Sequence, residues 1–188
     1  PSKKEEKMIA YLKAFGAKHN LETKVDEAGN VLIKKPATPG KENLQTVVLQ
    51  SHIDMVCEKN NDVQHDFLTD PIETEIDGEW LKAKGTTLGA DNGIGVATEL
   101  AILADDSIEH GPLECLFTVD EETGLTGAFA LKEGFMSGDI LLNLDSEDEG
   151  EIFIGCAGGI DSVAEFTYKE VEAVSYTHLR AHETDQYL

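Results

Sequence analysis

Histidine and carboxylate side chains, which together can bind divalent metal ions, occur at the ends of several short apolar segments. Three such segments lead into His52, into the adjacent pair Glu121 and Glu122, and into Asp145. Imidazole nitrogen and carboxylate oxygen are ligands that zinc accepts. A two-metal hydrolase needs a carboxylate between the metals, further ligands on each metal and a base beside the water. These residue types therefore indicate metal-assisted hydrolysis.

The ligand candidate His52 is followed two residues later by Asp54. A carboxylate in that place can hold one ring nitrogen, which fixes the tautomer and leaves the other nitrogen for a metal. The H-x-D pattern is common by chance, so it gains weight only beside the other candidates. Asp91, in a glycine-rich stretch, supplies one more carboxylate.

The pair Glu121 and Glu122 can divide two tasks between adjacent residues. Neighbouring side chains that leave a strand point in different directions, so one can bind metal while the other reaches the water. An exposed acidic turn at 120–122 is the alternative. The apolar strand before the pair argues against that alternative, because it is too hydrophobic for the edge of a sheet.

Two other patterns lack a residue that their sites require. The glycines at 93–95 resemble a dinucleotide-binding loop, but Thr98 stands where the third glycine should be. The acidic stretch at 145–150 resembles a calcium loop, but Cys156 occupies the position of the bidentate glutamate. Neither site is predicted.

Hydrophobic periodicity and turn residues predict the elements of the first half of the chain. A helix is expected to begin with a capping box formed by Ser2 and Glu5 and to stop at Gly16. One hairpin is expected over 23–33, and a second over 73–83 around an Asp-Gly turn.

Three strands that read as buried are predicted to carry the candidate ligands, at 46–50, 113–119 and 140–144. A helix opens in the glycine-rich loop and runs to about residue 103, and another covers about 125–135. Strands that alternate with helices indicate an α/β fold with a largely parallel sheet. Ligands of such sheets bind beyond the carboxyl ends of the strands, where the candidates lie.

The acidic composition excludes several classes of function. With 37 Asp and Glu residues against 15 Lys and Arg, the net charge is −22. We therefore expect no nucleic-acid partner and no attraction to an anionic membrane. No apolar run approaches the ~18 residues of a membrane span, and the start has no signal-peptide core. The three cysteines read as buried reduced thiols, so we expect a cytoplasmic protein.

The last stretch, 175–188, differs in style from everything before it. It continues no helix or strand pattern, and it contains His178 and His182, which lack the H-E-x-x-H order of a metal motif. We expect a non-native read-through tail that packs poorly and keeps both histidines away from the candidate site.

The residues from 1 to about 174 resemble the aminoacyl-histidine dipeptidases, also called Xaa-His or cytosolic non-specific dipeptidases, a family of two-zinc metallopeptidases. The resemblance is carried by these strings: QSHIDMV at 50–56, KNND at 59–62 with HDF at 65–67, GTTLGADNGIG at 85–95, EETG at 121–124, DSEDEGEI at 145–152 and GCAGGID at 155–161. H-x-D and E-E occur across the wider peptidase group, whereas the other strings point to the dipeptidase branch.

The resemblance implies a role for each candidate residue. His52 and Asp145 would bind one zinc, Asp91 would bridge both metals, and Glu122 would bind the second. Glu121 would be the general base and acid, and Asp54 would orient His52. The bond between Asp91 and Asn92 would be a cis peptide.

The implied activity is hydrolysis of dipeptides of the Xaa-His type, with broad specificity, by a water that two zinc ions activate. Co²⁺ or Mn²⁺ could replace zinc. The implied fold is a three-layer α/β/α zinc-peptidase-like catalytic domain with a largely parallel central sheet, incomplete here. Residues 1–158 would be the N-terminal part of this domain, 159–174 the start of a truncated lid, and 175–188 the tail.

The family supplies a last histidine ligand, and a lid used for homodimerisation, from segments that this sequence does not contain. We therefore expect the 188-residue chain to be inactive alone. Two alternatives stay open: a related zinc aminoacylase or peptidase of longer substrates, which the 59–67 loop disfavours, and a non-catalytic metal-binding module.

Overall fold

The structure is a computed structural model that describes residues 1–146, 148, 150–155, 158–159 and 162–168. Residues 1–150 form one compact unit, and a second unit begins at residue 151. The described residues of the second unit contain no helix or strand. The expected tail at 175–188, with His178 and His182, lies outside the described residues, so the expectation for it stays a prediction.

The first unit is built on a mixed five-stranded sheet in the order β1-β2-β6-β3-β7. Strands β3, β6 and β7 are parallel to one another, whereas β1 and β2 run antiparallel to their neighbours. The strands of this sheet have the following bounds: β1 Glu22–Val25, β2 Val31–Lys35, β3 Val47–His52, β6 Leu113–Thr118 and β7 Ile140–Asn143. The predicted α/β fold is confirmed, and its parallel part consists of the strands that carry the candidate ligands.

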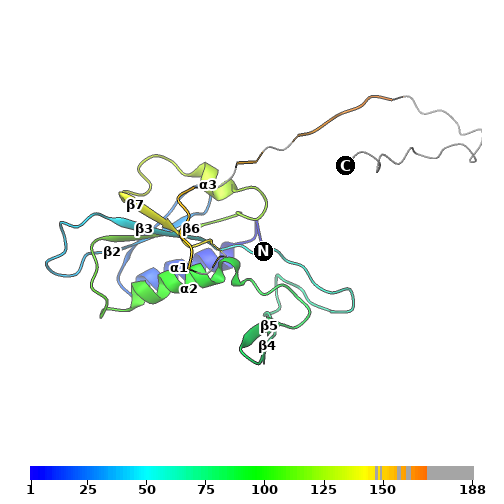
Figure 1. Ribbon diagram of the computed structural model, residues 1–188, viewed down its shortest axis with the longest axis horizontal. Helices are drawn as coiled ribbons and strands as arrows, with labels where there is room; N and C mark the ends of the chain where they lie inside the picture. The colour runs from blue at the N-terminus through cyan, green and yellow to red at the C-terminus, as the bar shows by residue number, and fades with distance from the viewer. Residues whose placement is uncertain (147, 149, 156–157, 160–161, 169–188) are drawn as a thin grey trace, which may run out of the picture. The chain divides into compact units, whose positions relative to one another are not determined.

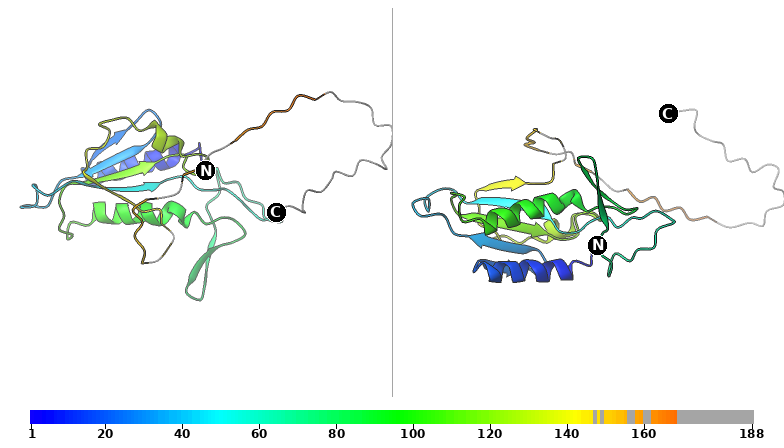
Figure 2. Two further views of the ribbon diagram at one scale, coloured as in Figure 1. Left: turned by 45° about the horizontal axis from the view of Figure 1, so that its top comes forward. Right: turned by 90° about the horizontal axis from the view of Figure 1, so that it is seen from below.

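Helices lie on both faces of the sheet, two on one face and a short one on the other. Helix α1 (Glu6–Lys18) and helix α2 (Ala90–Ala104) lie on the same side, and the short helix α3 (Thr126–Ala130) lies on the other (Figure 1; Figure 2 gives two further views). Because side chains alternate along a strand, Ile33 and Phe117 pack against α1 and α2, while Leu32 and Leu116 face the opposite way. This alternation makes the three layers that the sequence indicated.

Three sequence expectations were wrong in their details, and the first concerns α1. The helix begins at Glu6 and has no side-chain cap, because the Ser2 hydroxyl donates to Asp54 and the Glu5 carboxylate accepts from Lys3 N and Asp120 N. Gly16 does not end the helix. A Cβ there would lie 2.0 Å from Thr23 Oγ1, so the glycine permits close packing against β1.

The second correction concerns the helix predicted over 125–135. Helix α3 has only five residues, and the chain leaves it at Leu131. Leu131, Phe135 and Met136 then pack on the face of the sheet that α1 and α2 leave free. Burial of these three side chains outweighs their helical propensity.

The third correction concerns β7, which was predicted to be buried. Within the described residues β7 pairs only with β3, and Ile140, Leu141 and Leu142 are 40 to 49% exposed. The apolar strand is therefore an edge strand in this sheet.

The glycine-rich stretch and the second hairpin follow their predictions. The hairpin consists of β4 (Thr74–Asp77) and β5 (Trp80–Ala83), and it forms a separate two-stranded sheet. Its side chains Ile76, Trp80 and Leu81 are mostly exposed. None of the helices in the described part of the chain is long and apolar enough to cross a membrane.

Candidate metal centre

The candidate site lies where β3, β6 and β7 end at the same edge of the sheet. His52 is the last residue of β3 and is paired in register with Thr118 of β6. Glu121 and Glu122 follow β6, and Asp145 follows β7, whose end is tied to β3 by the bond from Leu144 N to Gln50 O (2.8 Å). Parallel pairing therefore brings side chains from three distant segments to one place.

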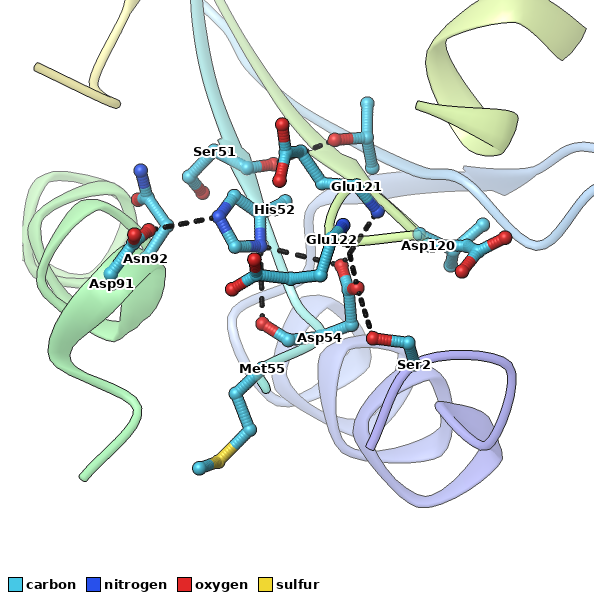
Figure 3. Close-up of polar contacts among 12 residues, drawn as sticks. Ser2, Ser51, His52, Asp54, Met55, Asp91, Asn92, Asp120, Glu121 and Glu122 are labelled. Carbon is cyan, nitrogen blue, oxygen red and sulfur yellow. Dashed lines mark hydrogen bonds and ion pairs between the residues drawn. The ribbon is translucent and has the colours of Figure 1, made fainter. Parts of the chain in front are cut away.

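His52 is 1% exposed and is held through both ring nitrogens. Its Nδ1 lies 3.1 Å from the Asp54 carbonyl oxygen and 3.3 Å from Asp54 Oδ1. Its Nε2 lies 3.0 Å from Asp91 Oδ1 and 3.6 Å from Asp145 Oδ1 (Figure 3 shows the first of these contacts). The ring nitrogen that points away from Asp54 thus faces two carboxylates.

Asp54 connects the end of β3 to the loop after β6. The backbone N–H groups of Glu121 and Glu122 donate to its carboxylate over 3.0 and 3.2 Å, and the Ser2 hydroxyl donates over 2.7 Å. Figure 3 shows these bonds converging on one side chain. Asp54 therefore positions the glutamate pair as well as His52.

The neighbours of each titratable group change its pKa. Burial opposes protonation of His52, but the contacts with Asp54 and Asp91 and the charge of Asp145 outweigh it and raise the pKa of His52 to about 9. For Asp54, burial favours the neutral acid, but the hydrogen bonds that it accepts win and hold its pKa well below the usual range. Because metal ligation needs a neutral imidazole, metal binding would release the proton that His52 holds.

Glu121 responds in the opposite direction from Asp54. Burial and the negative charges around it raise the pKa of Glu121, and His52 only partly opposes this. A carboxylate whose pKa is raised is a stronger base, which is the property that a general base near neutral pH requires.

Two sets of ligand atoms share His52 and fit a metal site. His52, Asp91 and Asp145 form one set, and His52, Glu121 and Glu122 form the other, with all ligand atoms of a set within 4.8 Å of one another. One imidazole with several carboxylates is a donor set that suits zinc. Both glutamates have a carboxylate oxygen within 4.8 Å of His52, so geometry alone does not separate the base from the metal ligand.

A third cluster consists of three buried carboxylate side chains beside this site, those of Glu5, Asp54 and Asp120. Its oxygens accept hydrogen bonds from backbone N–H groups and from the hydroxyls of Ser2 and Thr123. These donors account for the cluster as a structural network.

Two residues of the site escaped the sequence analysis. Ser2 was interpreted as a helix cap, although its hydroxyl reaches Asp54 across 52 residues. Asn92 was noted only for its peptide bond with Asp91, yet its side-chain amide donates to Asp145 Oδ1 and to the Leu144 carbonyl oxygen (3.0 Å). The polar residue directly after a candidate ligand was the available signal for Asn92.

The start of α2 departs from helical geometry where it carries Asp91. Asp91 and Asn92 have non-helical backbone angles, and the peptide bond between them is cis, as the resemblance implied. The Asp91 side chain is 57% exposed, which leaves it open to a ligand.

The sequence matches a known family of peptidases. The sequence profile described as peptidase family M20/M25/M40 matches residues 48–181, which include every candidate ligand. The chain belongs to this family. The predicted family relationship is therefore confirmed.

Two dipeptidases of the M20 family have high sequence identity to the chain. A cytosol non-specific dipeptidase of Escherichia coli is 56% identical over 161 residues, covering 86% of this chain and 33% of the relative. The crystal structure of an aminoacylhistidine dipeptidase from Vibrio alginolyticus has 59% identity and a TM-score of 0.78, covering 80% of this chain and 31% of that one. The chain thus spans about a third of the length of each relative.

A more distant M20 structure shares the fold with lower identity. The crystal structure of aminopeptidase PepT from Bacillus cereus has a TM-score of 0.66 at 26% identity and covers 79% of this chain and 40% of that one. The sequence is thus more similar to the aminoacylhistidine dipeptidase (59% identity) than to the aminopeptidase (26% identity).

Proposed function

We propose that this chain provides the N-terminal part of the catalytic domain of a two-zinc dipeptidase. The substrates would be dipeptides of the Xaa-His type, with broad specificity. The observation that carries the proposal is the pair of ligand sets that share the buried His52. High identity to two dipeptidases supports the substrate class.

Each proposed role is the one that the family resemblance implies for that residue. His52 and Asp145 would hold one zinc, Asp91 would serve both metals, and Glu122 would hold the second. His52 Nε2 faces Asp91 and Asp145, which supports this division. Asp54 orients His52 through Nδ1 and fixes the backbone of the glutamate pair.

Zinc ions bound here would supply Lewis-acid activation of a water and of the scissile carbonyl group. Glu121 then accepts a proton from that water and delivers it to the leaving amine. The raised pKa of Glu121 suits both steps, because the residue must gain and lose one proton in each cycle. The peptide bond is cleaved with one water consumed and no other reactant.

The complete enzyme is proposed to add a histidine ligand and a lid domain through which two subunits associate, and to act in the cytoplasm. A polypeptide of these 188 residues alone would lack that ligand and that lid. It is therefore proposed to hold metal weakly and to turn over little substrate.

The test is a hydrolysis assay of a complete protein that contains this segment. A panel of dipeptides, tripeptides and acylated amino acids is assayed before and after chelation, and again after zinc is returned. We expect dipeptide hydrolysis that chelation abolishes and zinc restores. Preferential hydrolysis of tripeptides or acylated amino acids would reject the substrate class, and metal binding without any turnover would reject the enzyme.

A further inference from the structure

The side chain of Asn92 is enclosed between the proposed ligands, although no role in the site follows from its residue type. It is 4% exposed, whereas its neighbour Asp91 has a side chain that is 57% exposed. We propose that Asn92 is a positioning residue, whose side-chain amide holds Asp145 in the place of a metal ligand before any metal binds. This inference rests on the proposed metal centre and deepens it.

The amide of Asn92 connects α2 to the end of β7. Its Nδ2 group donates to the Leu144 carbonyl oxygen over 3.0 Å and to Asp145 Oδ1. Leu144 N in turn donates to Gln50 O of β3, two residues before His52 (2.8 Å). One amide group therefore links the segments that carry Asp91, Asp145 and His52.

Electrostatic repulsion between two neighbouring carboxylates favours such a link in the metal-free protein, most of all when His52 is neutral. Asp91 and Asp145 both lie within 3.6 Å of His52 Nε2, so two carboxylates share a small volume. Like charges at this separation disfavour the arrangement unless donors or a cation offset the repulsion. Asn92 Nδ2 supplies a donor to Asp145 that remains when the metal is absent.

The orientation of the amide is decided by its partners. Both groups that Nδ2 contacts are acceptors, so the nitrogen must face them and Oδ1 must face the other way. Among the described residues Oδ1 has no donor, and it lies against Gly95, where a Cβ would be 1.9 Å from it. The same Cβ would also lie 2.9 Å from Ser51 Cβ. Glycine at position 95 therefore leaves the space that the amide occupies.

A second glycine on the same helix provides a matched control. A Cβ at Gly93 would meet nothing within 4 Å, and neither Gly93 nor Gly95 has a positive φ. Alanine at either position changes helical propensity equally. Only Gly95→Ala should displace Asn92 from Asp145.

The first experiment titrates the metal-free 188-residue chain with Co²⁺ and follows the d–d absorption. Asn92→Leu, which keeps the volume and removes the donor, and Gly95→Ala should each weaken Co²⁺ binding roughly 10- to 100-fold. Both should also change the shape of the spectrum, because Asp145 leaves the ligand set. Gly93→Ala should bind Co²⁺ as the wild type does. A titration and spectrum of Asn92→Leu equal to the wild type would overturn the proposal.

The second experiment needs neither a variant nor a metal. In an NMR spectrum of the metal-free chain, the side-chain amide protons of Asn92 should exchange slowly with solvent, because both acceptors are in place. Rapid exchange would overturn the proposal even if Co²⁺ binds. Slow exchange in this chain, combined with no Co²⁺ binding by a complete homologue, would support the contact and reject the proposed metal centre, so the two failures are distinguishable.

Discussion

Asp54 and Glu121 are carboxylates of the same site whose surroundings move their pKa values in opposite directions. Asp54 accepts bonds from two backbone N–H groups and from the Ser2 hydroxyl, which keep it ionised. Glu121 is partly buried among other negative charges, which raise its pKa. Separation of this kind assigns a fixed, charged role to one group and proton transfer to the other.

Substitution of the two glutamates in a complete homologue separates the base from the ligand. Glu121→Gln should keep both metals and lose nearly all turnover, because the proton carrier is removed while the ligands remain. Glu122→Gln should instead lower the metal content. Metal analysis combined with single-turnover kinetics measures both effects, and the reverse pattern would exchange the two roles.

Glu99 is a buried carboxyl group that the proposed mechanism does not use. It is 0% exposed on the inner face of α2, and among the described residues neither oxygen has a partner in good hydrogen-bond geometry, although the side chains of Ser51 and Cys115 lie nearby. Burial raises the pKa of Glu99 to about 9, and Ser51 and Cys115 oppose this only in part. The folded protein therefore holds a proton on Glu99 at neutral pH, whereas the unfolded chain, with a pKa near 4.5, does not.

The stability of the metal-free chain should consequently fall with rising pH between about 4.5 and 9. Because the folded pKa is the higher one, the contribution of Glu99 is complete below this window and is lost as the pH rises through it. One proton accounts for at most about 1.4 kcal/mol per pH unit. Glu99→Gln should remove this part of the slope and stabilise the protein at pH 8.

Urea unfolding of both proteins at a series of pH values measures the difference. His52, whose pKa is also raised to about 9, contributes a slope of the same sign to both proteins, so the comparison isolates Glu99. Parallel curves for the wild type and Glu99→Gln would mean that Glu99 is ionised in the folded state.

At the scale of elements, α2 runs from the site to the opposite ends of the strands. Its first residues carry Asp91, and its last turn has no basic residue of its own. Lys35 of β2 supplies the missing charge, since its Nζ donates to the carbonyl oxygens of Ile102 (3.0 Å) and Asp105 (2.7 Å). A cation at this end of a helix also interacts favourably with the helix dipole.

Lys35→Met should remove this cap while it keeps the buried aliphatic part of the side chain. The expected loss is about 1.5–3 kcal/mol of unfolding free energy, the range for hydrogen bonds to charged groups. Lys24→Met is the matched control, because the Lys24 side chain is 48% exposed and, in the described part of the chain, forms an ion pair only with Glu22. Equal unfolding midpoints for the two variants in urea would show that α2 does not depend on the cap.

At the scale of the molecule, the strands of the first unit expose apolar side chains at two places. One is the edge strand β7, with Ile140, Leu141 and Leu142, and the other is the β4–β5 hairpin, with Trp80 and Ile76. Exposed apolar strands favour association with further chain segments or with other molecules. The proposed lid and C-terminal ligand would belong to such further segments.

The 188-residue polypeptide, loaded with zinc, should therefore hydrolyse dipeptides at less than about a hundredth of the rate of a complete relative. A lost ligand weakens metal binding at least as much as the 10- to 100-fold cost of a lost supporting group. An open site also admits water to the reacting groups. The assay compares both proteins at equal protein and free zinc concentrations, and comparable rates would mean that the ligand scheme proposed above needs no further residues.

Local sequence patterns were sufficient for the parts of this protein that depend on short-range periodicity. Short apolar runs located β3 and β6, the Asp-Gly turn located the β4–β5 hairpin, and the strand ends located the candidate ligands. Strand periodicity and turn geometry arise within a few residues, so they can be recognised without the fold.

Only the tertiary structure decided which distant groups meet. Ser2 bonds to Asp54 rather than capping α1, the Asn92 amide reaches Asp145, and α3 ends early so that Phe135 can pack on the sheet. In each case a group satisfies its hydrogen bonds or buries its surface against a partner that is distant in the sequence. The free energy of such contacts exceeds local preference, and the partner is defined only when the strands are aligned in the sheet.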